Sequence, residues 1–427
     1  MDRIITPLRA LLPTPILNKI RPVYHFSLAL WGAFRYAYPS NHLTVIGITG
    51  TKGKTSTAEI LGSILEHAGF KVAILGTLHF KIGDKDERNL KKMTMPGRLF
   101  VQRFLRQAVD AGCTHAIIEM TSEGAKQFRH RFIAMDALIY TNLAPEHIES
   151  HGSFAKYREA KLSIAKALVK SPKLRKWLIV NADDENSGYF LKCADGSVTN
   201  VPYQLKDATP YTTKDSGVIF TFLGHTVTSP LPGTFNIMNI LGAATLAKRL
   251  GISPKLITEG IEKCTLIPGR MERIDLGQEF PVIIDYAHTP DSLLSAYNVF
   301  PEREIIAVLG NTGGGRDTWK RPVMGSIADE HCAHIILTNE DPYDEDPYTI
   351  LEEMSAGISK TPHHIELDRR QAIHQALSIA QHESRPSVVI ITGKGTDPYI
   401  MGPNGTKQEW DDRTVATEEL AKILAKK

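Results

Sequence analysis

The stretch LTVIGITGTKGKTSTAEIL, residues 43–61, joins a short apolar run to a helix-like segment through a loop of glycine, lysine and threonine. A strand, a glycine-rich loop and a helix in this order form a phosphate-binding site, since glycine lets the backbone approach phosphate and the helix N-terminus attracts anions. The usual loop has glycine five residues before Gly53, where Ile48 stands, with Gly47 and Gly50 nearby. The stretch therefore predicts a nucleotide site with altered glycine spacing.

The polar residues of this loop have the chemistry that such a site needs. Lys54 can reach the β- and γ-phosphates, and the Thr55 hydroxyl can bind Mg²⁺. A glycine turn that merely caps a helix is the alternative, and the strand–loop–helix context argues against it.

Composition places the chain among globular proteins with two or three domains. It has 427 residues, 42% hydrophobic and 23% charged, with a formal net charge of +3. No basic block of the nucleic-acid-binding type is present, so we expect no nucleic-acid partner. The four cysteines have no paired spacing, and no signal peptide or membrane-spanning run is apparent, so we expect a cytoplasmic protein.

Buried strands alternating with helices are expected over much of the chain. Apolar runs predict strands at residues 43–48, 72–75, 115–119, 137–140 and 177–181. Helical periodicity occurs at residues 54–68, 97–111 and 154–169. This alternation predicts a mostly parallel sheet. Turn-rich alternation at residues 207–230 predicts antiparallel hairpins, and a helix follows at residues 236–250.

A second α/β domain is expected after the stretch IPGRMERI. Its predicted strands are residues 282–285, 305–309, 334–338 and 388–392. The expected fold class is α/β: a central P-loop domain with a mostly parallel sheet plus antiparallel hairpins, followed by a Rossmann-like domain. The expected domains are an atypical helical segment (1–42), an ATP-binding domain (43–266) and a C-terminal domain (267–427).

The N-terminal segment is apolar and aromatic with few acids, and a helix is expected at residues 24–38. The favoured interpretation is a helix docked on the body of the protein. The alternative is an interfacial membrane helix with Trp31, Phe34 and Tyr36 near Arg21 and Arg35.

Polar residues follow two of the central strands. Glu119 ends one strand, and Glu146, His147, His151 and Lys161 follow the next. Ligands of open α/β sheets gather at the carboxyl ends of strands. Carboxylate, imidazole and threonine hydroxyl together favour magnesium at a nucleotide.

The sequence from about Leu43 to the C-terminus resembles the Mur ligases, which are ATP-dependent enzymes that add amino acids to peptidoglycan precursors. The most similar type is the E-type ligase, which extends a UDP-N-acetylmuramoyl dipeptide. The motifs that carry the resemblance are GITGTKGKTST, IIEMTSEGAKQFRHR, YTNLAPEHIESHGSFAKYREAK, IVNADDE, GTFNIMNILGA, IPGRMERI, IIDYAHTPDSL, GNTGGGRDTWKRPVMG and TGKGTDPYI. The altered glycine spacing matches the form that this family uses.

The resemblance implies a reaction through an acyl phosphate. ATP phosphorylates a substrate carboxylate, and an incoming amine displaces the phosphate. Lys54 is expected to stabilise charge on the γ-phosphoryl group. Thr55 and Glu119 match the ligands of one Mg²⁺, and His147 matches the ligand of a second. Lys161 matches a lysine that is carbamylated in the family, which needs a neutral amine to react with CO₂.

The resemblance also implies further binding residues. The expected ATP contacts are Gly50, Thr51, Lys52, Gly53, Lys54, Thr55, Ser56, Asn239, Arg270, Asp285, Tyr286 and His288. The expected contacts to the UDP-muramoyl peptide are Thr94, Ser122, Gln127 and Arg129. The expected contacts to the amino acid are Arg316, Asp341, Tyr343, Gly393 and Asp397.

Two departures from the family pattern bear on the substrates. About 42 residues precede the first strand, too few for the family's uridine-binding domain. The expected acceptor is a UDP-muramoyl peptide, and a lipid-linked precursor is the alternative that a membrane-facing helix would suit. The family's amino-acid-selecting stretch Asp-Asn-Pro-Arg is EDPY here, residues 340–343. Acids in that stretch favour an amine over a carboxylate, so we expect lysine or ornithine over diaminopimelate.

Other functions stay open at this point. They are a folylpolyglutamate-synthase-like ligase, a non-catalytic ATP-binding partner protein and a plain P-loop kinase. Retention of Lys54, Thr55, Glu119, His147 and Lys161 together favours a ligase over a protein that only binds ATP. We expect a monomer with ATP, an amino acid and a muramoyl peptide as small-molecule substrates, and a peripheral membrane contact as the alternative role of residues 1–42.

Overall fold

The computed structural model describes residues 14–146, 148–315 and 317–425, with side chains from Ile20 onward. By its internal contacts the chain divides into two compact units. The first unit is Met1–Leu143, Ala155–Gln204 and Ile240–Gly260; the second is Ala144–Phe154, Leu205–Asn239 and Ile261–Lys427. The chain therefore passes between the units several times.

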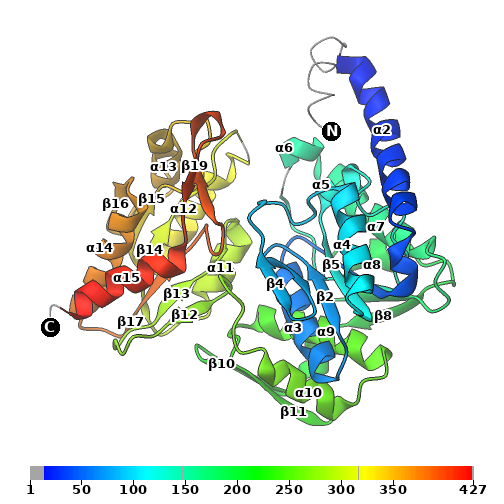
Figure 1. Cartoon of the computed structure of the whole chain (residues 1–427). Coiled ribbons are helices and arrows are strands. Elements are labelled where there is room, and N and C mark those ends of the chain that lie inside the picture. Colours follow the sequence, from blue (N-terminus) through cyan, green and yellow to red (C-terminus); the bar gives the residue numbers. More distant parts are fainter. Residues whose placement is uncertain (1–13, 147, 316, 426–427) are drawn as a thin grey trace. The chain divides into compact units, whose positions relative to one another are not determined.

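The first unit is built on an eight-stranded sheet (Figure 1). In spatial order its strands are β4 (Lys85–Arg88), β3 (His79–Ile82), β2 (Val72–Leu75), β5 (His115–Met120), β1 (Thr44–Thr49), β6 (Ala137–Tyr140), β7 (Trp177–Asn181) and β8 (Thr199–Tyr203). The six strands from β2 to β8 in this spatial order pair in parallel. Strand β3 pairs antiparallel with both of its neighbours, β2 and β4. Strands β2, β5 and β6 are buried along their whole length, as expected for apolar strands covered on both faces.

Helices cover this sheet and hold the polar loops at its edge. Helices α3 (Lys54–His67) and α4 (Arg98–Asp110) pack against the central strands. The other helices that lie largely in this unit are α5 (Ser122–Lys126), α7 (Phe154–Val169), α8 (Ser187–Leu191) and α10 (Pro254–Lys263). Helix α9 (Thr234–Arg249) begins in the second unit and continues into the first.

The N-terminal helix α2 (Thr14–Arg35) packs against α4. The contact is made by small residues: Ala29 and Ala33 are buried, and an added Cβ at Gly32 would lie 3.2 Å from the Leu99 side chain. The prediction of a helix docked on the body is confirmed, but both predicted bounds, 24 and 38, are wrong, since the helix begins at Thr14 and ends at Arg35. Ala37 and Tyr38 have positive φ, which turns the chain before Pro39.

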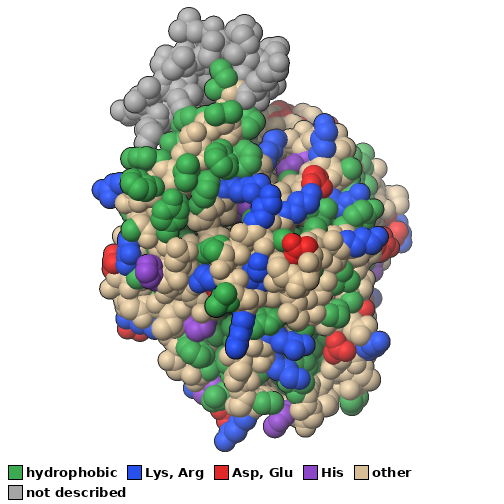
Figure 2. Space-filling model, turned by 90° about the vertical axis from the view of Figure 1, so that its right-hand side faces the viewer, with side chains coloured by type: hydrophobic (Ala, Val, Ile, Leu, Met, Phe, Trp, Pro, Cys, Tyr) green, Lys and Arg blue, Asp and Glu red, His purple; other side chains and the backbone are tan. Residues whose placement is uncertain are grey.

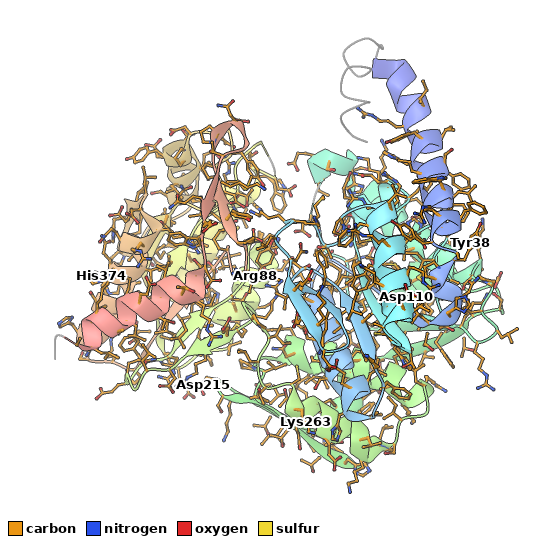
Figure 3. All side chains as sticks on the ribbon, in the orientation of Figure 1. Tyr38, Arg88, Asp110, Asp215, Lys263 and His374 are labelled. Carbon is orange, nitrogen blue, oxygen red and sulfur yellow. The ribbon has the colours of Figure 1, made fainter. Side chains whose placement is uncertain are left out.

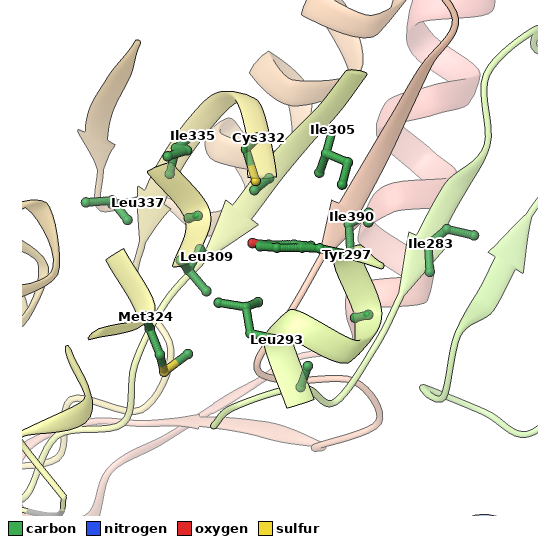
Figure 4. Packing of buried hydrophobic residues seen from close by; sticks show 14 of the residues in the cluster. Ile283, Leu293, Tyr297, Ile305, Leu309, Met324, Cys332, Ile335, Leu337 and Ile390 are labelled. Atoms are coloured by element: carbon green, nitrogen blue, oxygen red, sulfur yellow. The ribbon is translucent and has the colours of Figure 1, made fainter. Parts of the chain in front are cut away.

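The second unit contains a six-stranded sheet with its own core. Its spatial order is β12 (Glu272–Ile274), β13 (Val282–Ile284), β17 (Ser387–Ile391), β14 (Glu304–Leu309), β15 (Cys332–Thr338) and β16 (His363–Glu366). All pairs are parallel except β12 with β13. Figure 4 shows Tyr297, the last residue of helix α11 (Pro290–Tyr297), lying among aliphatic side chains of one face, including Leu309 and Ile390. The helices of this unit are α6 (Ile148–His151), α11 (Pro290–Tyr297), α12 (Lys320–His331), α13 (Pro347–Ser355), α14 (Arg369–His382) and α15 (Asp412–Leu424).

A small antiparallel sheet also belongs to the second unit. It contains β9 (Tyr211–Lys214), β10 (Gly217–Phe222) and β11 (His225–Ser229). Asp215, labelled in Figure 3 between β9 and β10, accepts hydrogen bonds from the Arg303 guanidinium at 3.1 and 3.2 Å. A second two-stranded ribbon pairs β18 (Tyr399–Met401) with β19 (Lys407–Glu409).

The expected fold class is confirmed, including the hairpins at residues 207–230 and every strand that was predicted. The structure adds strands that the sequence pattern did not indicate, among them β3, β4, β8 and β16. Strand β4 has the sequence KDER and is exposed throughout. A fully charged edge strand has no apolar alternation to recognise, which is why it was missed.

Candidate active site

The phosphate loop follows β1 and opens α3, as predicted. Gly50 has φ +154°, and an added Cβ there would lie 1.9 Å from the Thr141 hydroxyl. Gly53 is the N-cap of α3 with φ +79°. Only glycine fits Gly50, because its backbone conformation and its neighbour both exclude a side chain. The loop is held by the segment that follows β6, since the Thr51 N–H donates to the Asn142 carbonyl at 2.9 Å.

Two lysine amino groups meet at this loop. Lys54 Nζ donates to the carbonyls of Gly50 and Thr51, both at 2.9 Å. Lys161 Nζ, from α7, donates to the same Gly50 carbonyl at 2.7 Å, and its side chain is buried. The two predicted catalytic lysines therefore lie side by side, and their charges make the loop attractive to an anion.

The remaining loop residues have structural partners. Asn142 Oδ1 accepts from the Lys52 N–H at 2.9 Å, and the Lys52 carbonyl accepts from the Thr141 hydroxyl at 2.6 Å. The Thr51 hydroxyl is 2.9 Å from the hydroxyl of Tyr157, and Ser56 is buried in the first turn of α3. These bonds hold the loop backbone in a single arrangement.

Glu119 is the centre of a group of oxygen atoms at the carboxyl end of β5. The Thr55 hydroxyl donates to Glu119 Oε2 at 2.9 Å. Thr77 donates to the same carboxylate twice, from its N–H to Oε1 at 2.7 Å and from its hydroxyl to Oε2 at 3.0 Å. The Thr77 hydroxyl also lies 3.0 Å from that of Thr94. Hard oxygen donors of this kind fit Mg²⁺.

Apart from the oxygen atoms around Glu119, the described part of the chain shows no group of side chains that could bind a metal ion. Within residues 14–146, 148–315 and 317–425, no three His, Cys, Asp or Glu side chains gather as a metal site. His147, the predicted second ligand, lies outside the described residues, as does Arg316. Water and the phosphates of a bound nucleotide would complete a magnesium shell around Thr55 and Glu119.

The predicted acceptor residues also cluster in the first unit. Gln127 Oε1 accepts from the Arg129 guanidinium at 2.8 Å, and Arg129 donates to the carbonyl of Met95, next to Thr94. Ser122 is buried at the start of α5. Burial lowers the pKa of Arg129 from its ordinary value, so desolvation of its guanidinium strengthens its attraction for an anion. Thr94, Gln127 and Arg129 therefore lie near the group of oxygen atoms around Glu119.

Most of the predicted ATP contacts of the second unit are grouped after β13. The Arg270 guanidinium stacks over the Tyr286 ring, 4.5 Å from its centroid. Asp285 accepts from the backbone N–H groups of Met271 and Ala287. The negative charge of Asp397, followed by burial, raises the pKa of Tyr286 well above its ordinary value, so the phenol stays protonated.

His288 and Asn239 also have partners within the second unit. His288 Nδ1 is 2.7 Å from the Tyr286 carbonyl, and Nε2 is 3.0 Å from Glu146 Oε1. Asn239 Nδ2 donates to Asn236 Oδ1 at 3.1 Å on α9. The His288–Glu146 pair is a link that the sequence pattern did not indicate.

The predicted amino-acid residues surround a buried lysine. Lys394 Nζ, fully buried, donates to Asp341 at 2.8 Å and to Asp397 at 3.4 Å. Glu340 is 4% exposed: Oε1 accepts from Thr312, and Oε2 has no hydrogen-bond partner among the described residues. An added Cβ at Gly393 would lie 2.5 Å from that oxygen.

A pocket of about 690 Å³ lies beside this cluster in the second unit. Tyr343, which has φ +54°, lines it, and the strands β18 and β19 form another wall. Acidic residues of the pocket lining are Asp344, Glu345 and Asp346.

The sequence reasoning did not assign two residues of these clusters. Thr77 follows the end of β2, a position where functional residues of parallel sheets collect, and that placement was the available signal. Lys394 lies inside the quoted motif TGKGTDPYI, but nothing in the local sequence indicated that it pairs with Asp341, which is 53 residues away.

Comparison with known proteins gives matches over most of the chain. Residues 48–247 match the Mur ligase middle domain, and residues 269–395 match the Mur ligase glutamate ligase domain. A UDP-N-acetylmuramoyl-L-alanyl-D-glutamate–2,6-diaminopimelate ligase of Bacillus cereus is 33% identical over 92% of this chain and 81% of its own length. A UDP-N-acetylmuramyl-tripeptide synthetase of Roseiflexus is 33% identical over 96% of this chain and 84% of its own length. The chain belongs to the Mur ligase family.

Solved structures agree with this assignment. A UDP-N-acetylmuramoyl-L-alanyl-D-glutamate–2,6-diaminopimelate ligase has 27% identity and a TM-score of 0.61, covering 90% of this Mur ligase and 79% of the other chain. A folylpolyglutamate synthase of Mycobacterium tuberculosis shares the fold, with a TM-score of 0.68 at 16% identity over 96% of this chain and 97% of its own. Mur ligases are ATP-dependent ligases, so this chain is an enzyme of that class. In the described part of this Mur ligase, no helix is both long and apolar enough to cross a bilayer.

Proposed function

We propose that this Mur ligase adds an amino acid to a UDP-N-acetylmuramoyl peptide in peptidoglycan synthesis, in the cytoplasm and as a monomer. ATP first phosphorylates the peptide carboxylate, and the amine of the amino acid then displaces phosphate to form the amide. The names of its relatives, which cover most of the chain at 33% identity, support this acceptor.

The observation that carries the proposal is a continuous set of hydrogen bonds within the first unit. It runs from Thr55 of the phosphate loop to Glu119, from Glu119 to Thr77 and from Thr77 to Thr94. Thr55 belongs to the nucleotide end and Thr94 to the proposed acceptor end. A carboxylate held at Thr94 would therefore lie close to a phosphate held by the loop, as direct phosphoryl transfer requires.

The charged residues have separate proposed roles. Lys54 holds the transferred phosphoryl group, since its amino group lies over the loop where that charge develops. Thr55 and Glu119 would hold Mg²⁺, which would supply positive charge to balance the phosphates. Lys161, as a carbamate, would provide anionic oxygens for a second magnesium together with His147. Arg129 and Gln127 hold the acceptor, and Tyr286, His288, Arg270 and Asn239 hold the nucleotide.

We further propose that the added amino acid is basic. Lys394 balances the charge of Asp341. The Asp341 carboxylate is therefore not the one that attracts the amine of the substrate. Glu340 is the better candidate, because one of its buried oxygens has no partner among the described residues. Tyr343 occupies the position of the family's arginine and offers no cation to a distal carboxylate. Several relatives are named for diaminopimelate, so a direct comparison of amino acids is needed.

Mass spectrometry of reaction products tests acceptor and amine together. The full chain is incubated with ATP, Mg²⁺, UDP-N-acetylmuramoyl-alanyl-glutamate and an equimolar mixture of lysine, ornithine, diaminopimelate and neutral amino acids. We expect one amide product carrying lysine or ornithine, and none without ATP. A diaminopimelate product would overturn the choice of amino acid. ATP consumption that yields only phosphorylated acceptor, or activity only with folate and glutamate, would overturn the proposed reaction.

Two variants separate the roles within the site. Glu119→Gln should lower turnover by roughly 10²-fold or more, because it removes charge from the metal ligand. Thr94→Ala should mainly raise the KM for the acceptor and leave ATP binding unchanged. Glu185→Gln, an exposed carboxylate of the same unit, is the matched control and should behave as the wild type. Equal effects of all three changes would count against the assigned roles.

A further inference from the structure

The N-terminal helix α2 has a second face that no described residue covers. Ile20, Val23, Leu30, Trp31 and Phe34 are all exposed, with Val23 at 66% and Phe34 at 72%. At 100° per residue these five positions fall within an arc of about 100°. Ala29, Gly32 and Ala33, which pack on α4, lie on the opposite side. The helix therefore packs on the protein through its small residues, and its large apolar side chains point away from the protein.

This apolar stripe runs along about 21 Å of the helix, from Ile20 to Phe34. Figure 2 faces the side of the molecule on which α2 lies and shows hydrophobic side chains gathered there beside Lys and Arg side chains. Single exposed apolar residues are common, but a contiguous stripe of Trp, Phe, Leu, Ile and Val marks an interaction surface.

The charge around the stripe indicates what covers it. From Arg3 to Ala58 the sequence contains no aspartate or glutamate. Arg21 and Arg35 of α2 are exposed. Apolar and aromatic side chains flanked by cations, without acids, are complementary to a bilayer with anionic headgroups. A protein partner or a second copy of the chain would bury the stripe without needing this one-sided charge.

We propose that the α2 stripe docks this enzyme on the surface of an anionic phospholipid bilayer. The helix lies in the plane of the headgroups, with Trp31 and Phe34 inserted and Arg21 and Arg35 at the phosphates. This is peripheral attachment by one helix face, not a membrane span.

Docking also bears on the substrate, and this step rests on the proposed function. Phe26 of α2 packs edge-on against Phe128 and Phe132, with ring centroids 6.3 and 5.1 Å away. Arg98, which contacts His25 of α2, donates to the Gln127 carbonyl at 2.7 Å. The segment that carries Gln127 and Arg129 is therefore attached to α2, and docking places the acceptor residues beside the bilayer. Besides the UDP-linked peptide, this arrangement suits a second acceptor class, a muramoyl peptide on a lipid carrier in the same membrane.

Vesicle flotation of the full chain tests the docking surface. Vesicles of phosphatidylglycerol with phosphatidylethanolamine should carry the protein upward, and vesicles of phosphatidylcholine should carry much less. Trp31→Ser with Phe34→Ser should weaken partition roughly tenfold or more. Arg21→Glu with Arg35→Glu, or high salt, should weaken it on anionic vesicles. Leu174→Ser, at a fully exposed leucine that is not part of α2, is the matched control and should float as the wild type does.

Specific results would overturn the proposal. Absence of flotation, or equal flotation of the Trp31→Ser/Phe34→Ser and Leu174→Ser variants, rules out docking through the stripe. Dimerisation would also rule out the proposal if light scattering showed that it depends on protein concentration and that the Trp31→Ser/Phe34→Ser variant abolishes it. A second copy of the chain would then cover the stripe. Unfolding curves must show that the variants fold, which their exposed positions favour.

The substrate step has its own readout. Ligase rates are compared for a soluble UDP-linked acceptor and for a lipid-linked muramoyl dipeptide in anionic vesicles. The Trp31→Ser/Phe34→Ser variant should lose rate only with the vesicle-borne acceptor. No product from that acceptor while flotation persists overturns the lipid-linked class and leaves docking intact. No amide from either acceptor overturns the proposed function, and flotation still reports on docking.

Discussion

At the scale of single residues, the conformation of the phosphate loop requires glycine at position 50, which has φ +154°. We expect Gly50→Ala to destabilise the protein by about 2 kcal/mol or more, since it combines a disfavoured backbone conformation with a clash against Thr141. Nucleotide binding should be lost as the loop shifts. Thermal unfolding and ADP titration measure both effects.

Gly69 is the matched control for this change. It also has positive φ, at +87°, but an added Cβ meets nothing within 4 Å. Gly69→Ala should cost only about 1 kcal/mol and leave ADP binding intact. If both variants bind ADP as the wild type does, the close fit of Gly50 against Thr141 has no role in the loop.

Lys161 offers a test of the proposed carbamate. Lys161→Ala should lower turnover by roughly 10²-fold or more, with nucleotide binding retained. Acetate should restore part of the rate, because a small carboxylate can occupy the vacated space and supply anionic oxygens. Rescue by methylamine in place of acetate would show that Lys161 works as a cation, as its 2.7 Å hydrogen bond to the Gly50 carbonyl would also allow.

Residue positions were predictable where the residues belong to a local motif. Lys54 and Thr55 follow from the loop sequence and its position between strand and helix, and the structure places both as that motif implies. Lys394 and Thr77 did not follow, because their partners are distant in sequence. Lys394 meets Asp341 only after β15 and β17 enter one sheet.

At the scale of elements, a charged triad fixes the β3–β4 hairpin to α3. His79 lies between Glu59 of α3, at 2.9 Å, and Asp86 of β4, also at 2.9 Å. Burial alone would lower the pKa of His79, but the two carboxylates outweigh it and raise the pKa from 6.5 to about 9. The hairpin follows Thr77, so its attachment also supports the group around Glu119.

The raised pKa predicts how stability depends on pH. The imidazolium is favoured in the folded state, so its contribution is fully present below about pH 6.5 and is lost as pH rises through about 9. We expect wild type to lose on the order of 2 kcal/mol relative to His79→Gln between these limits. Unfolding free energies of both proteins from pH 6 to about 10 measure this difference. Parallel curves would contradict a charged His79.

Helices and strands were predictable where their apolar residues form a helical repeat or a continuous run. The strands of both parallel sheets are continuous apolar runs, since they are buried on two faces, and all of the predicted ones are present. Strand β4 carries only charged residues and forms because β3 offers it an open edge. Its partner β3 precedes it by only two residues, but neither strand carries the apolar pattern by which the other strands were predicted.

At the scale of the whole molecule, the proposed C-terminal domain has a self-sufficient core. The buried clusters on the two faces of its sheet consist of residues between Met271 and Ile423. Among the described residues, the half-buried Phe235 is the only one outside residues 267–427 that packs against these clusters. We therefore expect a fragment of residues 267–427 to fold alone and to unfold cooperatively. Circular dichroism and thermal unfolding test this, and a fragment without cooperative unfolding would show that residues 205–239 are needed.

Sequence alone determined the α/β class, the order of its buried apolar strands and of the helices between them, the phosphate loop and the family. These depend on periodicity and short motifs, which are local properties of the chain. Tertiary structure decided what those residues touch: Glu119 with Thr55 and Thr77, Asp341 with Lys394, and α2 with its apolar side chains outward. The physical reason is that charge balance and burial depend on neighbours distant in sequence, and a pattern with the period of a helix does not say which side faces the protein.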